Sequence, residues 1–323
     1  MPNKPVSQAT KFGWSYLTQW STCQTRWWNS QLRRHPKAPK GQLGIEKRTV
    51  PDYLVIGSAF HKFAEDWFMS GWDGSKDTGI RELDEPLTNG VELVRSMAHK
   101  IKGGPDIATK AEAIVRGLTQ GYHQYYQHDT LRVAVADDGT PLVEQEFTLE
   151  VGTGYLFTAR LDTVVFDPTD PTGLWDLEHK TADASKVNGL KEAFYIDGQI
   201  TGQQLQMEAQ WGDRVRGVKA DIAVKRAKEI EPYQRKDYHR PQAQLEKFQM
   251  DARRRLAAIK SATDEYNHLL DCHMSQDEAA RVAFDASHSG TQICTGCDFF
   301  ALCKNRAQSE WLVEMDYLPK EPR

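Results

Sequence analysis

The sequence predicts an α/β fold in which helices flank a mixed sheet and both ends of the chain build a helical portion. Three observations predict it. Apolar residues recur at helical spacing in several segments before residue 130. From about residue 131 the pattern changes to short β-rich runs, separated by turn sequences such as DDGT and DPTDPTG. After Pro241 a long polar segment again favours a helix, because proline suits the first helical turn.

The first part of the chain holds the predicted N-terminal helices. Residues 14–32 have the pattern of an amphipathic helix, and RRHPKAPKGQLG after them is typical of a loop. The next helix is expected over residues 57–70, and two more within 81–102 and 107–127. We therefore expect a helical region over residues 1–130.

The middle of the chain holds the predicted strands. LRVAVADD, LVEQEFTLEV, YLFTARLDTVVF and LWDLEHKT all favour strands. A helix is expected around residues 190–211, and RGVKADIAVK at 216–225 indicates a further strand. These elements define an expected core over residues 131–240. Residues 241–323 add the long helix, to about residue 270, and a tail with three cysteines.

The composition is that of an ordinary globular protein, with 39% hydrophobic and 27% charged residues in a chain of 323. No apolar run approaches the roughly 20 residues of a membrane helix. The first residues, MPNKPVSQATKFGWS, lack the apolar core of a secretory signal. We therefore expect a cytoplasmic protein with no membrane partner. In a reducing compartment a set of cysteines indicates a metal site rather than a disulfide framework.

Basic residues are concentrated in two segments of a chain whose net charge is −4. Residues 1–50 hold nine Lys and Arg against one acidic residue, and residues 214–240 hold nine against four. Such segments can form the electrostatic footprint of a polyanion, and they can equally be solvated surface. In the second segment we select Lys225, Arg226 and Lys228 as candidate phosphate contacts.

Two carboxylates are expected to face each other in RLDTVVFDPTDPTGLWDLEHKTA, residues 160–182. If this hairpin folds near Asp170, residues whose numbers sum to about 340 are opposed, and Asp162 then faces Glu178. Opposed side chains lie about 5 Å apart, so a cation such as Mg²⁺ would relieve their repulsion. Lys180 projects from the same strand face as Glu178 and could orient or activate a metal-bound water. The alternative is an exposed hairpin with ordinary surface charges.

Three cysteines stand at C-x2-C-x5-C in CTGCDFFALC, as Cys294, Cys297 and Cys303. A structural zinc ion or an iron–sulfur cluster usually takes four ligands, so this set is one short. Four thiolates would suit either occupant. A redox-active CxxC pair is a further reading of the first two cysteines. Cys272 falls outside the spacing and is expected to be a small buried residue instead.

Taken together, these motifs resemble the PD-(D/E)XK nuclease superfamily. Asp162 followed by Glu178-His179-Lys180 resembles its D…(D/E)-x-K motif. GSAFHKFAED, with Gly57, His61 and Glu65, resembles the G-x-x-x-H-x-x-x-E pattern of the RecB-like branch. DGQITGQQLQ resembles the Q-x-x-x-Y motif of that branch at Gln199, although Gln203 stands where the branch has tyrosine. VKRAKEIEP resembles the basic strand that follows.

The resemblance implies a PD-(D/E)XK core and a metal-dependent DNA nuclease. It implies that His61, Asp162 and Glu178 bind Mg²⁺ or Mn²⁺, that Lys180 assists the attacking water and that Gln199 helps to position the nucleic acid. Taken by itself, a histidine such as His61, on a helix with Phe60, Phe63 and Trp67, is more often a packed core residue, and the order of the motifs makes the two readings equal. The expected substrate is DNA, single-stranded or with free ends, cut by an exonuclease. The chain has no helicase P-loop, so an unwinding or recombination partner would be a separate protein.

The same resemblance supplies a fourth cysteine. A RecB-like subset that includes Cas4-like proteins holds a [4Fe–4S] cluster with one N-terminal and three C-terminal cysteines, which here correspond to Cys23 and to Cys294, Cys297 and Cys303. Such a cluster would clip the two chain ends together, and zinc is the less favoured occupant. The expected setting is DNA repair, recombination or phage or CRISPR DNA processing. The alternatives are a binding protein of this fold without catalysis and a zinc-stabilised DNA-binding protein.

Overall fold

The computed structural model describes residues 11–152, 154–226, 230–286, 294, 296–305 and 309–320. The chain divides into two compact units. The first contains residues 1–48, 150–157 and 249–323, and the second contains residues 49–149 and 158–248. Both chain ends therefore contribute to the first unit, as the sequence predicts, while the second contains most of the sheet.

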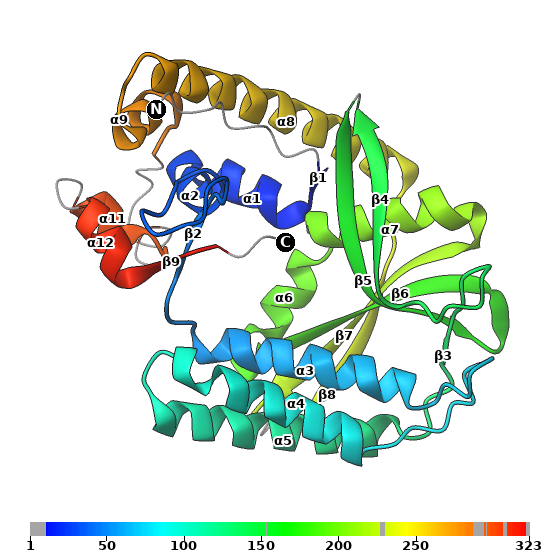
Figure 1. The fold of residues 1–323 in the computed structure, drawn as a ribbon. Coiled ribbons are helices and arrows are strands. Elements are labelled where there is room, and N and C mark those ends of the chain that lie inside the picture. Colours follow the sequence, from blue (N-terminus) through cyan, green and yellow to red (C-terminus); the bar gives the residue numbers. More distant parts are fainter. Residues whose placement is uncertain are drawn as a thin grey trace. The chain divides into compact units, whose positions relative to one another are not determined.

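The larger sheet has the strand order β1-β5-β6-β7-β8, with β3 and β4 also paired to β5 (Figure 1). The strand bounds are β1 Lys11–Phe12, β3 Arg132–Val133, β4 Val143–Gly152, β5 Tyr155–Asp167, β6 Asp170–Asp183, β7 Val215–Lys225 and β8 Tyr233–Tyr238. β6 is antiparallel to β5 and parallel to β7, and β8 is antiparallel to β7. The predicted mixed sheet is confirmed, and β8 is an addition to the predicted strands.

The hairpin of β5 and β6 has the predicted register. Val164 pairs with Asp176 and Val165 pairs with Trp175, so the residue numbers of each pair sum to 340. The turn itself is displaced, because Asp167 pairs with Asp170 after a register shift in β5. The same register, continued two residues beyond Val164, would place Asp162 opposite Glu178, and the structure shows the neighbouring contact of the His179 backbone N–H with Asp162 Oδ2.

Three helices cover one face of this sheet in the second unit: α3 Asp52–Met69, α4 Asp84–Met97 and α5 Pro105–Tyr126. Their apolar side chains share a buried core with the sheet (Figure 1). Phe60, Phe63 and Trp67 of α3 meet Tyr122 of α5, and the sheet contributes Leu177. The period of these aromatic residues on α3 is that of one helix face, so the sequence pattern and the packing agree.

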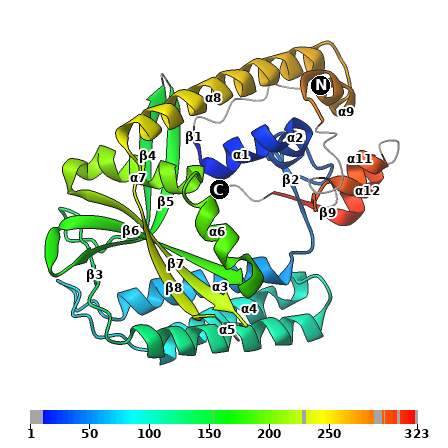
Figure 2. The same ribbon diagram turned by 180° about the vertical axis from the view of Figure 1, so that it is seen from behind.

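Helices α6 Val187–Ala193 and α7 Gly198–Trp211 cover the opposite face, as Figure 2 shows from behind. Their core includes Phe194 and Ile200 against Ala220 and Ile222 of β7. The predicted single helix over 190–211 is wrong, because Asp197 begins a new helix. Its side chain accepts hydrogen bonds from the backbone nitrogens of Gln199 and Ile200, at 2.6 and 3.3 Å, and so caps α7.

Alternation along β6 separates the side chains of the Glu-His-Lys motif. Glu178 bonds to α7 on one face, whereas the His179 ring lies among aromatic rings of α3 and α5 on the other. Lys180 returns to the face of Glu178 and bonds to it. The sequence prediction that Lys180 projects from the same strand face as Glu178 is therefore confirmed, and His179 points to the other face.

The first unit is built from both chain ends. Its helices are α1 Trp14–Thr22, α2 Gln24–Gln31, most of α8 Gln242–Asp271, α9 Gln276–Ala283, α11 Phe300–Lys304 and α12 Ser309–Asp316. The predicted single helix over 14–32 is wrong, because Cys23 has extended backbone (φ −167°, ψ 116°) and separates α1 from α2. Strand β2 Ile45–Lys47 pairs with β9 Tyr317–Pro319 and joins the two ends directly.

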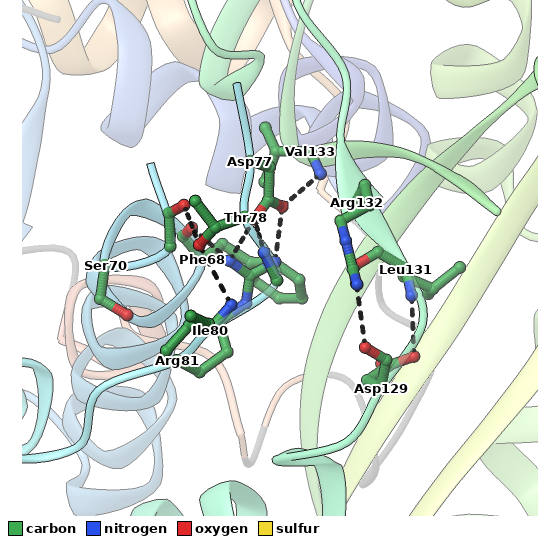
Figure 3. Close-up of polar contacts among 12 residues, drawn as sticks. Phe68, Ser70, Asp77, Thr78, Ile80, Arg81, Asp129, Leu131, Arg132 and Val133 are labelled. Carbon is green, nitrogen blue, oxygen red and sulfur yellow. Dashed lines mark hydrogen bonds and ion pairs between the residues drawn. The ribbon is translucent and has the colours of Figure 1, made fainter. Parts of the chain in front are cut away.

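An ion pair organises the loop that follows α3 (Figure 3). The Arg81 guanidinium donates two hydrogen bonds to the Asp77 carboxylate, at 2.7 and 2.6 Å, and both side chains are at most 3% exposed. Asp77 also accepts from the backbone nitrogens of Gly79 and Val133, at 2.8 and 2.7 Å. Because Val133 belongs to β3, this one carboxylate ties the loop to that strand.

None of the described helices is long and apolar enough to span a membrane.

Candidate nuclease active site

Glu178 is fully buried, and its carboxylate is held by three donors. Oε1 accepts hydrogen bonds from Lys180 Nζ and from Gln199 Nε2, the latter at 2.7 Å. Oε2 accepts from Gln203 Nε2. Gln199 and Gln203 lie four residues apart on α7 and therefore on one side of the helix. Gln203, which stands where the RecB-like pattern has tyrosine, here fixes the second oxygen of Glu178.

Asp162 of β5 contacts both the histidine helix and the Glu-His-Lys strand. Its Oδ2 lies 3.3 Å from His61 Nδ1 and accepts the backbone N–H of His179 at 2.8 Å. Burial acts to raise the pKa of Asp162, but the facing His61, together with Lys180 and His179, outweighs burial and lowers this pKa to about 2. The structure thus brings Asp162 into contact with His61 and with the backbone of His179, the residue that follows Glu178.

Glu144 of β4 completes a group that the sequence analysis missed. One ligand atom each from His61, Glu144 and Asp162 lies within 4.8 Å of the others. Burial and the nearby Asp162 raise the pKa of Glu144 to about 7. Glu144 also has a positive φ of 51°. The strand prediction covered its segment, but no local motif marks Glu144, because its proximity to His61 arises from tertiary packing.

These groups line a pocket of about 550 Å³. One wall comes from α3, which contributes residues near one another on the helix surface: Tyr53, Leu54, Gly57, Ser58, His61, Lys62 and Glu65. Glu144, Asp162 and Lys180 from the sheet form another part of the lining. All three residues of the G-x-x-x-H-x-x-x-E pattern, Gly57, His61 and Glu65, therefore face one cavity.

Comparison with protein families agrees with this geometry. A model of the PD-(D/E)XK nuclease superfamily matches residues 12–304. The chain belongs to the PD-(D/E)XK nuclease superfamily. The superfamily consists of nucleases that use divalent metals, so the protein is a metal-dependent nuclease in this broad sense. No curated protein sequence matches the chain.

The donor set of the PD-(D/E)XK pocket suits a divalent cation. His61 offers a ring nitrogen, and Asp162 and Glu144 offer hard carboxylate oxygens at close range. Mg²⁺ and Mn²⁺ prefer such oxygen ligands, and imidazole is compatible with Mn²⁺. Glu178 is the residue before His179, whose backbone N–H donates to Asp162, so Glu178 lies next to this group. Both carboxylate oxygens of Glu178 already accept hydrogen bonds from side chains. Its role as a ligand stays a prediction.

Lys180 is a positively charged side chain of the pocket in this nuclease. Burial acts to lower the pKa of Lys180, but Glu178 and Asp162 outweigh burial and raise it above the ordinary value. Asp176 is a buried neighbour two residues before Glu178, and burial together with Glu178 raises its pKa well above the ordinary range. Burial and Glu178 thus disfavour the ionised form of Asp176, whereas Glu178 and Asp162 favour the charged form of Lys180.

A buried polar network supports His179 from behind the strand. Asp221 of β7 accepts hydrogen bonds from Tyr122 and Tyr126, at 2.6 and 3.2 Å, and from Arg235 at 2.9 Å. Its carboxylate lies 3.7 Å from the His179 ring. Burial lowers the pKa of His179 to about 4, so this histidine is neutral at physiological pH. The network thus lies beside the segment of β6 whose backbone N–H donates to Asp162.

The four cysteines assigned to a cluster all belong to the first unit. Cys23 lies at the break between α1 and α2, and Cys303 is in α11. Burial raises the pKa of the Cys297 thiol, and the nearby Cys23 adds to this rise. Cys272 is exposed, contrary to the expected burial, and its sulfur lies 3.9 Å from His268 Nε2. The cluster assignment stays a prediction.

The basic candidates differ in their surroundings. Lys225 is 7% exposed, and its ammonium lies 3.6 Å from Asp183. Arg226 is exposed, with a positive φ of 56° at the end of β7. Lys228 lies outside the described residues. Arg226 is thus the described member of this set that is accessible for a phosphate contact.

The low pKa of Asp162 makes the free energy of unfolding of the metal-free nuclease fall as the pH is lowered into the acid range. The unfolded value is 3.8 and the folded value about 2, so the ionised carboxylate stabilises the folded state above the first value. This contribution disappears as the pH falls through the second. We expect Asp162→Asn to remove this part of the acid dependence. Melting temperatures of both proteins between about pH 5 and about pH 2 test it, and parallel curves would contradict the assignment.

Proposed function

We propose that the protein is a Mg²⁺- or Mn²⁺-dependent deoxyribonuclease of the RecB-like, Cas4-like branch, acting as an exonuclease on single-stranded DNA or free ends. The observation that carries the proposal is the meeting of His61, Asp162 and Lys180 in one pocket of a PD-(D/E)XK protein. The proposed setting is DNA repair, recombination or phage or CRISPR DNA processing. A separate helicase or recombination protein would supply unwound strands.

The proposed ligands of the divalent cation are His61, Asp162 and, from the resemblance, Glu178. A bound cation would polarise the phosphate and lower the pKa of a water molecule. The chain supplies the surroundings for this chemistry. His61 and Asp162 are already in contact at 3.3 Å, so little rearrangement of these two side chains is needed to present them together.

Lys180 is proposed to stabilise the negative charge that develops on the phosphate during hydrolysis. Its raised pKa supports this electrostatic role rather than that of a proton acceptor, because a general base must be neutral before it acts. Glu178 holds the Lys180 ammonium in place, and Gln199 and Gln203 hold Glu178. Gln199 is therefore proposed to act through Glu178 in addition to any contact with DNA.

Phosphate contacts are proposed for Arg226 and Lys228, with Lys225 as a further member of the set. The exposure of Arg226 supports a direct contact. Lys225 would first have to leave its position beside Asp183. Binding through such contacts should weaken as salt rises, because each neutralised phosphate releases condensed counterions.

A [4Fe–4S] cluster on Cys23, Cys294, Cys297 and Cys303 is proposed as a structural element of the first unit. Support comes from the C-x2-C-x5-C spacing and from the influence of Cys23 on the Cys297 thiol. A cluster there would link residue 23 to residue 303 and restrict the unfolded chain. Zinc is the alternative occupant, because four thiolates also suit it.

Replacing Cys23 by Ala tests this cluster. We expect the variant to lose bound iron and the broad brown absorbance, and to melt several degrees lower than the wild type. Cys272→Ala is the matched control and should keep both iron and stability, since Cys272 lies beside His268 outside the spacing. Iron analysis of anaerobically purified protein decides the point. Zinc in place of iron, or iron retained by Cys23→Ala, would contradict the proposal.

A cleavage assay tests the activity directly. Anaerobically purified full-length protein is incubated with end-labelled single- and double-stranded DNA, with Mn²⁺, with Mg²⁺ and with a chelator. The proposal predicts metal-dependent shortening from ends and faster loss of single strands. Binding of DNA with no cleavage under any metal condition would instead support the non-catalytic alternative.

A further inference from the structure

The two glutamates of the active site are in different states. Glu178 is fully buried, and both of its oxygens accept hydrogen bonds from side chains. Glu144 lines the pocket, and its side chain is 24% exposed. Its nearest ion pair is with Arg160, whose Nη1 lies 3.8 Å away and whose side chain is 63% exposed. Of these two glutamates, Glu144 is therefore the one whose carboxylate is accessible from the pocket, while Glu65, which also lines it, pairs with Lys62.

The neighbours of Glu144 favour a cation at this place. Glu144 and Asp162 bring two carboxylates close to the His61 ring, with ligand atoms within 4.8 Å of one another. Two ionised carboxylates at this range repel each other unless a positive charge lies between them. A protonated His61 supplies one such charge, and a divalent cation would supply a larger one while using the imidazole as a ligand.

We propose that Glu144 is a direct ligand of the divalent metal, together with His61 and Asp162. The inference rests on the proposed function, because it concerns the cation of the same pocket. It assigns to β4 a functional side chain that neither motif of the superfamily includes. Glu178, held by Lys180, Gln199 and Gln203, then orients the lysine and completes the site from the other side.

The chemistry of the proposed set determines the choice of substitution. Gln keeps the size of Glu144 and one neutral oxygen but removes the charge, so it weakens a metal site without leaving a large void. Glu146 provides a matched control, because it lies two residues further on β4 and is exposed. Glu146→Gln changes the net charge of the protein by the same amount.

Metal binding is measured in the absence of DNA by titrating Mn²⁺ into the full-length protein. Electron paramagnetic resonance reports the concentration of free Mn²⁺. The proteins compared are the wild type, Glu144→Gln and Glu146→Gln. We expect Glu144→Gln to weaken Mn²⁺ binding by about 10-fold or more, and Glu146→Gln to change it less than about 2-fold. The melting temperature without metal reports folding. Glu144→Gln should melt at or above the wild-type temperature, because it removes one of two facing carboxylates.

The outcomes separate this inference from the proposed function. If wild type and Glu144→Gln bind Mn²⁺ equally while the wild type cleaves DNA, Glu144 is not a ligand and the nuclease proposal stands. If the wild type neither binds Mn²⁺ nor cleaves DNA, both proposals are wrong. If Glu144→Gln melts far below the wild type, Glu144→Asp replaces it. If Glu144→Asp folds and binds Mn²⁺ more tightly than Glu144→Gln, the inference is supported. If Glu144→Asp folds and binds Mn²⁺ no more tightly than Glu144→Gln, the inference is wrong.

Discussion

Asp162→Asn is expected to reduce metal-dependent cleavage of DNA on the order of 10³-fold, because the pocket loses a charge required for transition-state stabilisation. Asp162 faces His61 at 3.3 Å, so the variant weakens the pair that would hold the cation. Asn retains an oxygen that can accept the backbone N–H of His179, and the hairpin should keep its register. The effect should therefore appear in the cleavage rate far more than in the fold.

The matched control is Asp167→Asn on the same strand. Asp167 accepts hydrogen bonds from the backbone and hydroxyl of Thr169, and Asn can keep one accepting oxygen there as well. It lies at the turn, away from the pocket lining, and should leave the cleavage rate within about 2-fold of the wild type. Equal rates for Asp162→Asn and wild type, measured with end-labelled DNA at saturating Mn²⁺, would move the active site elsewhere.

Glu178→Gln does not separate an effect on cleavage from an effect on folding, because of the hydrogen bonds that Glu178 accepts. Lys180, Gln199 and Gln203 all donate to Glu178. A Gln at this position would direct its own N–H₂ group toward at least one of these donors, and a buried donor would lose its acceptor. We expect loss of activity accompanied by loss of stability, so this variant cannot separate the two.

The part of the site that strand geometry alone predicts lies within one hairpin, whereas the family resemblance predicts His61 and Gln199. A strand alternates its faces with a period of two, and a tight turn fixes which residues are opposed. These two rules are enough to bring Asp162 opposite Glu178 and to separate Lys180 from His179. The observed pairs Val164 with Asp176 and Val165 with Trp175 have the register that the sequence predicts.

The unpredicted part depends on contacts between segments distant in the sequence. Glu144 approaches His61 only because β4 pairs with β5 and α3 packs beside them, and no local pattern encodes that distance. The contact of Gln203 with Glu178 has the same origin, although its place one turn after Gln199 gave a partial signal. Local caps explain the helix errors: Asp197 begins α7, and the extended Cys23 divides α1 from α2.

Stability of the second unit depends strongly on a carboxylate outside the active site. Asp77 lies in the loop between α3 and α4, and it accepts two hydrogen bonds from Arg81 and two from the backbone nitrogens of Gly79 and Val133 (Figure 3). The Arg81 side chain is 3% exposed, and its guanidinium also lies over the rings of Trp67 and Phe68, at 5.4 and 5.1 Å from their centroids. The surroundings are apolar enough that an unpaired charge would be costly.

Asp77→Ala is expected to lower the free energy of unfolding by about 3 to 5 kcal/mol, because it leaves a buried guanidinium without this carboxylate. Asp77→Ala/Arg81→Leu should recover part of the loss, since the buried charge is removed with its partner, while Gly79 and Val133 still lack their acceptor. Asp73→Ala, at an exposed site of the same loop, removes local hydrogen bonds from Ser75 and Lys76 and should lower the free energy of unfolding far less than Asp77→Ala does. Denaturant titrations of the four proteins measure these differences.

At a temperature where Asp77→Ala is folded, this variant should still cleave DNA, because the pocket lining does not include Asp77. If Asp77→Ala were as stable as Asp73→Ala, the ion pair would not be the interaction that holds this loop to β3.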